Sequence, residues 1–360
     1  MKSTEFKIDT TPPVLVTGAT GYLAGWIVKK LLEGGATVHA TVRDPSRTEK
    51  FQYLNDIAAA TPGTIRFFKA ELLDKGSFAE AMEGCGVVFH TASPFATLVD
   101  DPQRDLIDPA KLGTRNVLEQ ANQTASVNRV VLTSSCAAIY GDNADVANAP
   151  GGILTEEVWN TSSSVDHQPY SYSKTVAEQE AWKIADAQDR WRLVVINPSF
   201  ILGPAVNPDA GGESMSLMTQ FGDGTMKSGT ADLGMGMVDI REVSQAHLAA
   251  AFLPDAEGRH IVSGYNSSFL ELARMLHANY GDRFPVPGRA APKWLLWLIG
   301  SFVNKAFTRK VVSRNVGVAW KADNRKSRER LGINYRPLEK TVCEMFQQLI
   351  DAGRLSPAKG

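Results

Sequence analysis

The sequence predicts a fold of the α/β class, in which a doubly wound parallel sheet is followed by a smaller, mainly helical domain. Three observations support this prediction. Short apolar strands alternate with helical segments, a glycine-rich turn joins the first strand to the first helix, and the alternation becomes irregular after Pro198. Because helices must cover both faces of such strands, we expect consecutive units to form a parallel sheet with right-handed crossovers.

Six strands are predicted before the irregular part of the chain, each a short run of mainly β-branched and other apolar residues. Their ranges are 14–17, 37–42, 65–68, 87–91, 129–133 and 193–196. Helical segments are predicted between them at 26–32, 77–82, 112–122 and 173–187. The first helix is expected to end at Gly34-Gly35, since glycine commonly follows a helix C-terminus.

The chain after Pro198 is predicted to be less regular. Residues 203–236 are rich in glycine, proline and methionine, which predicts long loops and short helices. A helix at 242–253 and a strand at 260–263 follow, and 266–350 is mainly helical. The expected domains are a cofactor domain of residues 1–200 with 237–264, and a substrate-binding domain of 201–236 with 265–360.

Composition and charge exclude several classes of protein. Of the 360 residues, 43% are hydrophobic and 21% charged, which excludes a disordered chain, a coiled coil and a fibrous repeat. The net charge of −1 gives no electrostatic reason to expect nucleic acid or an anionic membrane as the main partner. The three cysteines, Cys85, Cys136 and Cys343, are too far apart to indicate a disulfide framework or a metal site.

The sequence also predicts a cytoplasmic location. Residues 1–11 carry charges and lack the apolar stretch of a signal peptide. The longest apolar run, 294–299, falls far short of the roughly 20 residues that span a bilayer. We therefore expect no membrane partner, and either a monomer or a homodimer.

The turn after the first strand has the composition of a dinucleotide-binding loop. It reads Thr17-Gly18-Ala19-Thr20-Gly21-Tyr22-Leu23-Ala24-Gly25, after a predicted strand and at the start of a helix. Gly18 allows the tight turn, and Gly21 lets backbone amides approach a pyrophosphate at the positive end of the helix. We expect a Rossmann-type domain, with an ordinary strand-to-helix turn as the alternative. The loop residues expected to contact the cofactor are Gly18, Thr20, Gly21, Tyr22 and Leu23.

The end of the second strand indicates which nicotinamide cofactor binds. An acidic residue there favours the 2′-hydroxyl of NAD, and a basic residue favours the 2′-phosphate of NADP. Here the strand ends in Val42-Arg43-Asp44-Pro45, and Arg47 and Lys50 follow. A guanidinium can stack on adenine and pair with phosphate, so the sequence favours NADP(H). The alternative is that these cations are simply solvated.

Tyr170 and Lys174 form a Tyr-x-x-x-Lys pair. Positions four apart share one face of a helix, so both side chains are expected to point the same way. An ammonium beside the phenol is expected to lower its pKa and to make it an acid–base group. The fifth strand ends in Thr133-Ser134-Ser135, at the edge where ligands bind, and a serine hydroxyl there could hydrogen-bond a substrate carbonyl. Each feature alone is common on protein surfaces, but their order behind a glycine loop favours catalysis.

Together these motifs resemble the extended short-chain dehydrogenase/reductases. Within that superfamily the chain is similar to the group of dihydroflavonol reductases, cinnamoyl-CoA reductases and fungal aldehyde/ketone reductases, from about residue 14 to about residue 341. The segments that carry the resemblance are 16–21, 41–45, 88–94, 133–135, 170–178, 197–199 and 238–243.

The resemblance implies roles for individual residues. Tyr170 would protonate the carbonyl oxygen, Lys174 would tune Tyr170 and hold the nicotinamide ribose, and Ser135 would orient the carbonyl. Arg43 and Lys50 would bind the 2′-phosphate.

Further positions of the resemblance would contact other parts of the cofactor. Glu71 and Leu72 would lie beside the adenine, where the group usually has Asp-Leu. Along the pyrophosphate and ribose of the cofactor would lie Thr91, Ala92 and Ser93. The nicotinamide would be flanked by Pro198, Ser199 and Ile201. His90 is interpreted as structural, and no metal ligand is expected.

Two departures from the group narrow the substrate. Cys136 to Tyr140 lacks the asparagine of the flavonoid members, and 168–172 lacks the Asn-Trp-Tyr-Cys-Tyr motif of the thioester-reducing branch. A ketone or aldehyde with an apolar or aromatic body remains as the expected substrate, and the methionine-rich loop after Gly203 is expected to select it. The candidate pocket residues are Phe95, Ile139, Met215, Met218, Phe221 and Met226, and for each of them ordinary core or loop packing is the alternative.

Two alternative functions stay open at this stage. The chain could be a hydroxysteroid-type dehydrogenase or an NAD-dependent sugar epimerase/dehydratase, although Arg43 argues against retained NAD. It could instead be a non-catalytic NADP-sensing protein, but such proteins generally lack the pair formed by Tyr170 and Lys174. The physiological substrate, the product stereochemistry and the direction of the reaction in the cell do not follow from the sequence.

Overall fold

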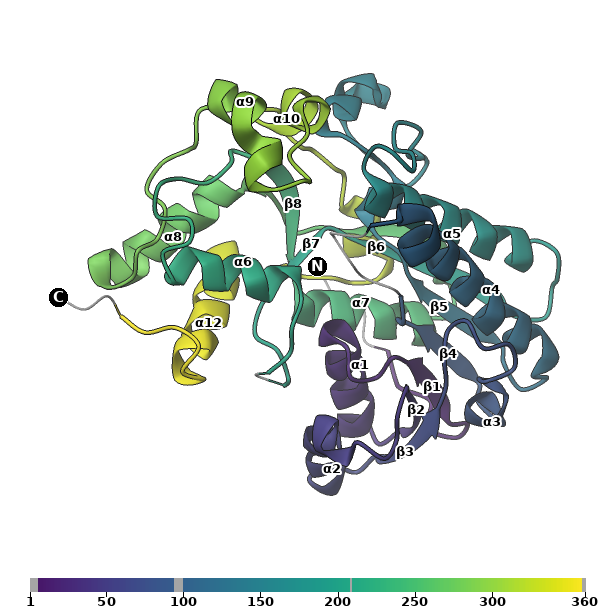
Figure 1. Cartoon of the computed structure of the whole chain (residues 1–360). Coiled ribbons are helices and arrows are strands. Elements are labelled where there is room, and N and C mark those ends of the chain that lie inside the picture. Colours follow the sequence, from purple (N-terminus) through teal and green to yellow (C-terminus); the bar gives the residue numbers. More distant parts are fainter. Residues whose placement is uncertain (1–5, 94–99, 208, 358–360) are drawn as a thin grey trace.

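The structure, a computed structural model, describes residues 6–93, 100–207 and 209–357. Its centre is a seven-stranded parallel sheet in the order β3-β2-β1-β4-β5-β6-β9 (Figure 1). The strands in chain order are β1 (Val14–Thr17), β2 (Thr37–Val42), β3 (Thr64–Lys69), β4 (Val87–His90), β5 (Arg129–Thr133), β6 (Arg192–Pro198) and β9 (Gly258–Val262). The predicted α/β class with a Rossmann-type sheet is therefore confirmed.

Helices cover both faces of this sheet, because alternate strand residues point to opposite sides. Side chains of α1, α2 and α7 form one core cluster with the sheet, and those of α3, α4 and α5 form the other. These helices are α1 (Tyr22–Glu33), α2 (Gln52–Ala59), α3 (Ala79–Met82), α4 (Asp108–Gln123), α5 (Pro169–Ala185) and α7 (Ile240–Phe252).

The first turns of three helices lie outside the ranges predicted from the sequence. Helix α1 begins at Tyr22, α4 at Asp108 and α5 at Pro169, each four residues earlier than the apolar periodicity indicates. The missed turn of α5 includes Tyr170.

The rest of the chain forms a smaller unit beside the sheet. It contains α6 (Glu213–Gly222), α8 (Phe269–Tyr280), α9 (Lys293–Val303), α10 (Arg309–Asn315) and α12 (Leu338–Asp351), whereas α11 (Arg325–Arg330) packs against β9 of the large sheet. It also contains a three-stranded sheet, ordered β10-β8-β7, of β7 (Phe200–Leu202), β8 (Gly234–Asp239) and β10 (Tyr265–Ser268).

The sequence did not predict this small sheet, and the loops expected up to Gly236 end earlier, where β8 begins. Glycines in β8 serve close packing. A Cβ on Gly236 would lie 2.3 Å from the Trp320 ring, and one on Gly234 would lie 2.9 Å from the Val318 carbonyl oxygen. Because the Trp320 ring occupies the space where a side chain of this strand would lie, β8 has glycine there and lacks the β-branched pattern by which strands are recognised in a sequence.

The two units are joined by hydrogen bonds and by returning chain. The Tyr22 hydroxyl donates to the Gly203 carbonyl at 2.5 Å, and the Trp26 indole donates to the Pro204 carbonyl at 2.8 Å. After β8, helix α7 packs on α1, and β9 pairs with β6 in the large sheet. Within the described ranges, no helix is both long and apolar enough to cross a membrane.

Candidate active site

The predicted site residues follow strands that end at the same edge of the large sheet. Strands β1, β4, β5 and β6 are parallel neighbours, so the segments after them meet at their carboxyl ends. The sheet order reverses between β1 and β4, which makes this edge a topological switch point where ligands bind in such folds.

The glycine loop lies against the segment that follows β4. Gly18 has a φ of +64°, and a Cβ there would come within 3.1 Å of the Ala92 Cβ. The Gly18 amide donates to the Thr41 hydroxyl at 3.1 Å, which ties the loop to the end of β2. A larger residue at Gly18 would be strained and would push Ala92 away. The backbone thus requires glycine here, as the sequence analysis expected.

The N-terminus of α1 is open to a ligand. Its N-cap is Gly21, which supplies no side-chain hydrogen bond, and the first turn contains no acidic residue. Thr20 and Gly21 are exposed at this end of the helix. The uncapped amides and the positive end of the helix dipole can therefore bind a phosphate group.

Two other loop residues use their side chains for packing. Leu23 is buried in the core beneath α1, and the Tyr22 hydroxyl is committed to Gly203. Only their backbone groups remain available for the cofactor contacts that the sequence predicted.

The residues expected around the adenosine end are on the surface. Arg43 and Lys50 are exposed, and within the described chain neither forms an ion pair. Arg47, in contrast, pairs with Glu49 at 3.4 Å. Arg43 follows β2 closely, and the end of β2 holds the glycine loop through Thr41.

Glu71 and Leu72 follow β3 on the adjacent side of the loop. Glu71 is exposed, and its backbone amide donates to the Ser77 hydroxyl at 3.2 Å. Leu72 packs closely against Gly113 of α4, and its carbonyl accepts a hydrogen bond from Asn116 at 2.8 Å. Both positions are thus held by local contacts, with the Glu71 carboxylate facing solvent.

The three residues expected to be catalytic are close together. The Tyr170 and Ser135 hydroxyls are hydrogen-bonded. The Lys174 Nζ lies 5.7 Å from the centre of the Tyr170 ring and donates to the Ser93 hydroxyl at 3.0 Å. The α5 helix therefore brings Tyr170 and Lys174 to the ends of β4 and β5, as their spacing predicts.

Burial shifts the pKa values of both Tyr170 and Lys174, and the shift of Tyr170 is opposite to the one predicted from the sequence. Burial raises the pKa of Tyr170 to about 12, the Ser135 hydrogen bond opposes the rise, and the Glu213 carboxylate adds to it. The spacing of Tyr170 and Lys174 had predicted that the Lys174 ammonium would lower this pKa. Lys174 instead hydrogen-bonds Ser93, and burial lowers its own pKa to about 8. Tyr170 thus retains its proton at neutral pH.

His90 is linked through the Thr17 hydroxyl to the backbone amides that follow β4. Its Nδ1 lies 3.0 Å from the Thr17 hydroxyl, which also accepts the amides of Thr91 and Ala92 at 3.1 and 3.0 Å. Burial, and secondarily Lys174, lowers the pKa of His90 to about 3. A neutral histidine in these bonds fits the structural interpretation and holds the 91–93 segment against the glycine loop.

The segment expected to flank the nicotinamide contains a buried hydroxyl without a partner. Pro198 is buried at the end of β6, and Ile201 is partly buried against the core under α1. The Ser199 Oγ is buried and makes no hydrogen bond within the described residues. A buried polar atom left without a partner is costly, so this hydroxyl is suited to bind a polar group of a ligand.

A buried ion pair lies one turn beyond Lys174, where the sequence analysis assigned no role. The Glu178 carboxylate accepts from Arg259 Nε at 2.6 Å, the Ser134 hydroxyl at 2.5 Å and the Asn197 amide at 2.8 Å. It links α5 to β5, β6 and β9. The sequence signal was weak, because Arg259 lies 81 positions further along the chain.

A second network, also not predicted, holds the start of α5. Asp142 is fully buried and accepts from Arg314 Nε at 2.5 Å, Asn315 at 2.7 Å and Gln168 at 3.3 Å, with His167 Nε2 at 2.8 Å. Gln168 precedes α5 in a left-handed conformation, with a φ of 56°. The network therefore fixes the strained backbone two residues before Tyr170.

Most of the residues proposed to line a substrate pocket pack inside the protein instead. Met215, Met218 and Phe221 lie on one face of α6 and are buried in the core of the smaller unit, and Met226 packs against that core. Ile139 belongs to another buried cluster with Trp320. Phe95 lies outside the described residues. The apolar spacing on α6 thus reflects packing against α8 and α12.

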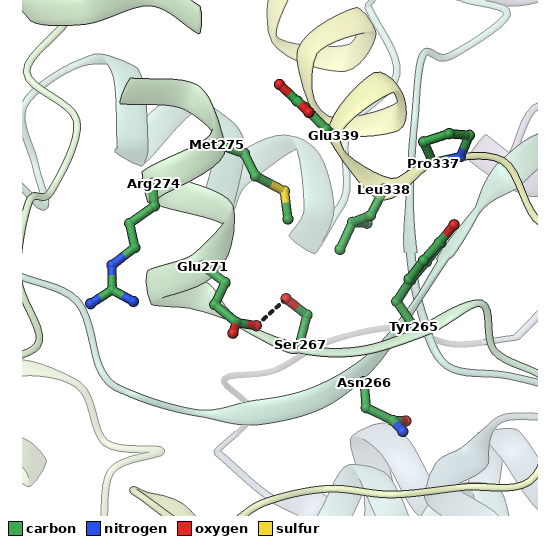
Figure 2. A pocket seen from close by; sticks show the side chains of 9 residues that line it. All are labelled: Tyr265, Asn266, Ser267, Glu271, Arg274, Met275, Pro337, Leu338 and Glu339. Carbon is green, nitrogen blue, oxygen red and sulfur yellow. Dashed lines mark hydrogen bonds between the residues drawn. The ribbon is translucent and has the colours of Figure 1, made fainter. Parts of the chain in front are cut away.

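A surface hollow of about 550 Å³ lies elsewhere, among β10, α8 and the start of α12 (Figure 2). Its polar groups are used locally: Ser267 donates to Glu271 at 2.6 Å, and Glu271 also accepts the Ser268 amide at the start of α8. None of the predicted site residues lines it, so it is not the candidate active site.

Among the described residues, no cluster of three or more His, Cys, Asp or Glu is placed to hold a metal ion.

Comparison with known proteins gives consistent matches along the chain. Residues 14–262 match the family described as the NAD dependent epimerase/dehydratase family. A cinnamoyl-CoA reductase of Medicago truncatula is 33% identical over 340 residues, which is 93% of this chain and 95% of that protein. A tetraketide alpha-pyrone reductase of Arabidopsis thaliana is 37% identical over 283 residues, 77% of this chain and 83% of the relative.

Solved structures show the same architecture. Gre2 of Candida albicans in complex with NADPH is 27% identical, with a TM-score of 0.76 over 95% of this chain and 99% of that chain. The yeast methylglyoxal/isovaleraldehyde reductase Gre2, also complexed with NADPH, is 26% identical, with a TM-score of 0.75 over 95% and 100%.

Proposed function

We propose, from the membership of this chain in the NAD dependent epimerase/dehydratase family, that it reduces a ketone or aldehyde to an alcohol with NADPH. Within that family the chain is one of the extended short-chain dehydrogenase/reductases. The observation that carries the proposal is the half-buried, hydrogen-bonded pair of Tyr170 and Ser135, with the buried Lys174 one turn away and bonded to Ser93. The reaction is reversible, so the same site would oxidise the alcohol with NADP⁺.

The residues at the sheet edge fit NADP(H). The uncapped start of α1 would bind the pyrophosphate, and the exposed, unpaired cations Arg43 and Lys50 would bind the 2′-phosphate. The buried Ser199 hydroxyl has no partner among the described residues and would bond a polar group near the nicotinamide. NADPH, when bound, supplies the hydride that is added to the carbonyl carbon.

The chain's own residues then hold the substrate and move the proton. Ser135 and Tyr170 would both hydrogen-bond the carbonyl oxygen, which orients the substrate and stabilises charge that develops on that oxygen. Tyr170 keeps its proton at neutral pH because of its raised pKa, and it would donate this proton to the oxygen. Lys174 would stabilise the resulting phenolate and hold the ribose hydroxyls of the cofactor.

Replacing the proton donor tests this assignment. Tyr170→Phe removes only the hydroxyl, so kcat is expected to fall by about 10²–10⁴-fold while NADPH still binds. NADPH oxidation with a panel of aromatic and aliphatic ketones and aldehydes measures the loss, and fluorescence titration measures binding. Tyr172→Phe, on the same helix, is the matched control and is expected to keep wild-type activity. Near-normal turnover by Tyr170→Phe would refute the role.

The proposed cofactor preference has its own test. Arg43→Ala is expected to raise KM for NADPH by at least about tenfold and to leave KM for NADH nearly unchanged, since only NADPH carries the 2′-phosphate. Arg47→Ala is the matched control, because Arg47 already pairs with Glu49. Equal effects of Arg43→Ala on both cofactors would contradict the assignment.

A further inference from the structure

Helix α9 is apolar but does not belong to any core of the described protein. Apart from Lys293, Gly300 and Ser301, every residue of this helix is apolar. Its side chains Trp294 and Phe302 are nevertheless 66% and 89% exposed, and Trp297, Leu298 and Ile299 are exposed as well. Exposed apolar side chains grouped on one helix indicate a surface that binds something.

The same part of the chain carries a concentrated positive charge. From Arg283 to Lys321 there are eight lysines and arginines and no aspartate or glutamate. Within the described residues only Arg314 among them forms ion pairs, with Asp142 and Asp145. The net charge of −1 for the whole chain conceals this local excess.

The charges and the aromatic side chains are adjacent. The Arg309 guanidinium lies 4.5 Å from the centre of the Trp297 ring. Lys293 shares a shallow surface hollow with Trp294, Trp297 and Leu298. Helix α9 packs against α10, and in Figure 1 this pair lies at the periphery of the smaller unit. We call the exposed face of α9, with the exposed cations Lys293, Lys305, Arg309 and Lys310 that flank it in the chain, the α9 surface.

We propose that the α9 surface docks the protein on an anionic lipid membrane. A helix of this length cannot span a bilayer, but tryptophan, phenylalanine and leucine side chains flanked by lysine and arginine are suited to the membrane interface. Basic groups near the membrane add attraction to anionic headgroups. The proposal stands on these surface residues alone and does not depend on the reductase function.

Two other occupants fit the surface less well. In a symmetric dimer the same patch faces itself, so the cations of one copy would oppose those of the other. A nucleic acid would complement the charge, but the aliphatic side chains Leu298 and Ile299 offer it neither stacking nor hydrogen bonds. An anionic membrane satisfies both the charge and the apolar side chains.

Vesicle flotation tests the proposal. The full chain is expected to float with phosphatidylcholine vesicles that contain phosphatidylserine and much less with pure phosphatidylcholine, and added salt should weaken the binding. The double variant Trp294→Ser/Phe302→Ser and the double variant Lys305→Glu/Lys310→Glu are each expected to lower the bound fraction at least about tenfold. Reductase activity and circular dichroism establish that the variants are folded.

Matched variants elsewhere on the surface serve as controls. Leu112→Ser replaces an exposed leucine of α4, and Lys75→Glu/Lys183→Glu reverses two exposed lysines away from α9. These are expected to bind vesicles like the wild type. The proposal is overturned if the wild type does not float with anionic vesicles or if the α9 variants float equally well. It is also overturned if those variants only convert a dimer to a monomer, or if RNA binds and vesicles do not.

Discussion

Helices α5 and α9 reverse the usual relation between polarity and burial. Helix α5 is polar, yet it buries Lys174, Glu178 and Glu180, whereas α9 is almost wholly apolar and leaves Phe302 exposed. The two buried carboxylates of α5 are paired with arginines, Glu178 with Arg259 and Glu180 with Arg115 at 2.7 Å, and Lys174 donates to the Ser93 hydroxyl. Natural sequences break such rules mainly at functional sites, so both helices are candidates for function.

The largest effect on stability is expected from Glu178→Ala. Removing this carboxylate leaves the buried Arg259 without its counter-charge, and breaking a buried ion pair in this way costs about 3–5 kcal/mol. Urea unfolding measures the loss. Gln179→Ala, exposed on the same helix, is the control and is expected to change stability by less than about 0.5 kcal/mol. A loss of under about 1 kcal/mol for Glu178→Ala would show that the polar face of α5 is not held by this pair.

Lys174→Met is expected to separate stability from activity. Burial lowers the pKa of Lys174 from 10.5 to about 8, and a tenfold change in proton affinity is worth about 1.4 kcal/mol. The charged lysine therefore destabilises the cofactor-free fold at neutral pH, and the variant is expected to be up to about 3 kcal/mol more stable there. Its turnover is expected to fall by at least about 100-fold.

The difference in stability between Lys174→Met and the wild type is expected to shrink as the pH rises above 8. Between pH 8 and about 10.5 the unfolded lysine still holds its proton while the folded one has lost it, so the stability of the wild type rises toward that of Lys174→Met. Denaturation of both proteins without cofactor at pH 7 and at about pH 10 measures this. Lys183→Met, exposed on the same helix, is the control. A difference independent of pH would contradict the buried ammonium.

The sequence predicts most of the large sheet and less of the smaller unit. Strands β2 and β5 have the predicted bounds, because each is a short β-branched run buried in the sheet. Strand β8 was missed, since Gly234 and Gly236 are there to admit neighbouring chain and the Trp320 ring. The hydrophobic pattern therefore predicts a strand where its side chains pack in a core. It fails where a close approach of neighbouring chain requires glycine.

The candidate site divides in the same way. The glycine loop and the pair of Tyr170 and Lys174 have local spacings that can be read directly from the sequence. The partners that hold α5 do not, because Arg259 lies 81 positions from Glu178 and Arg314 lies 172 positions from Asp142. Contacts between such distant positions follow only from the fold.

Asp142→Asn is expected to have an intermediate effect, on the start of α5. Burial raises the pKa of Asp142, but hydrogen bonds from His167, Asn315 and Arg314 outweigh this and hold it below its usual value. At neutral pH the carboxylate therefore stabilises the fold, and this contribution is lost only as the pH falls through its lowered pKa. The amide is expected to cost about 1–3 kcal/mol and to lower kcat about tenfold, with KM for NADPH unchanged.

Asp166→Asn is the control for this positioning effect, because Asp166 is exposed one residue before His167. Steady-state kinetics and urea unfolding of the two variants measure the split between kcat, KM and stability. If Asp142→Asn loses stability without any change in kcat, the network supports the fold and does not position Tyr170.

The smallest effect is expected on α9, where Phe302→Ala should change the free energy of unfolding by less than about 0.5 kcal/mol. Its matched control is Phe346→Ala on α12, which removes a fully buried ring and is expected to cost about 3–5 kcal/mol. Urea unfolding at several protein concentrations measures both. A loss above about 1 kcal/mol for Phe302→Ala that grows with concentration would mean that a second copy covers α9. A small and concentration-independent change would mean that the most apolar helix contributes almost nothing to folding, which is expected of a surface retained for binding.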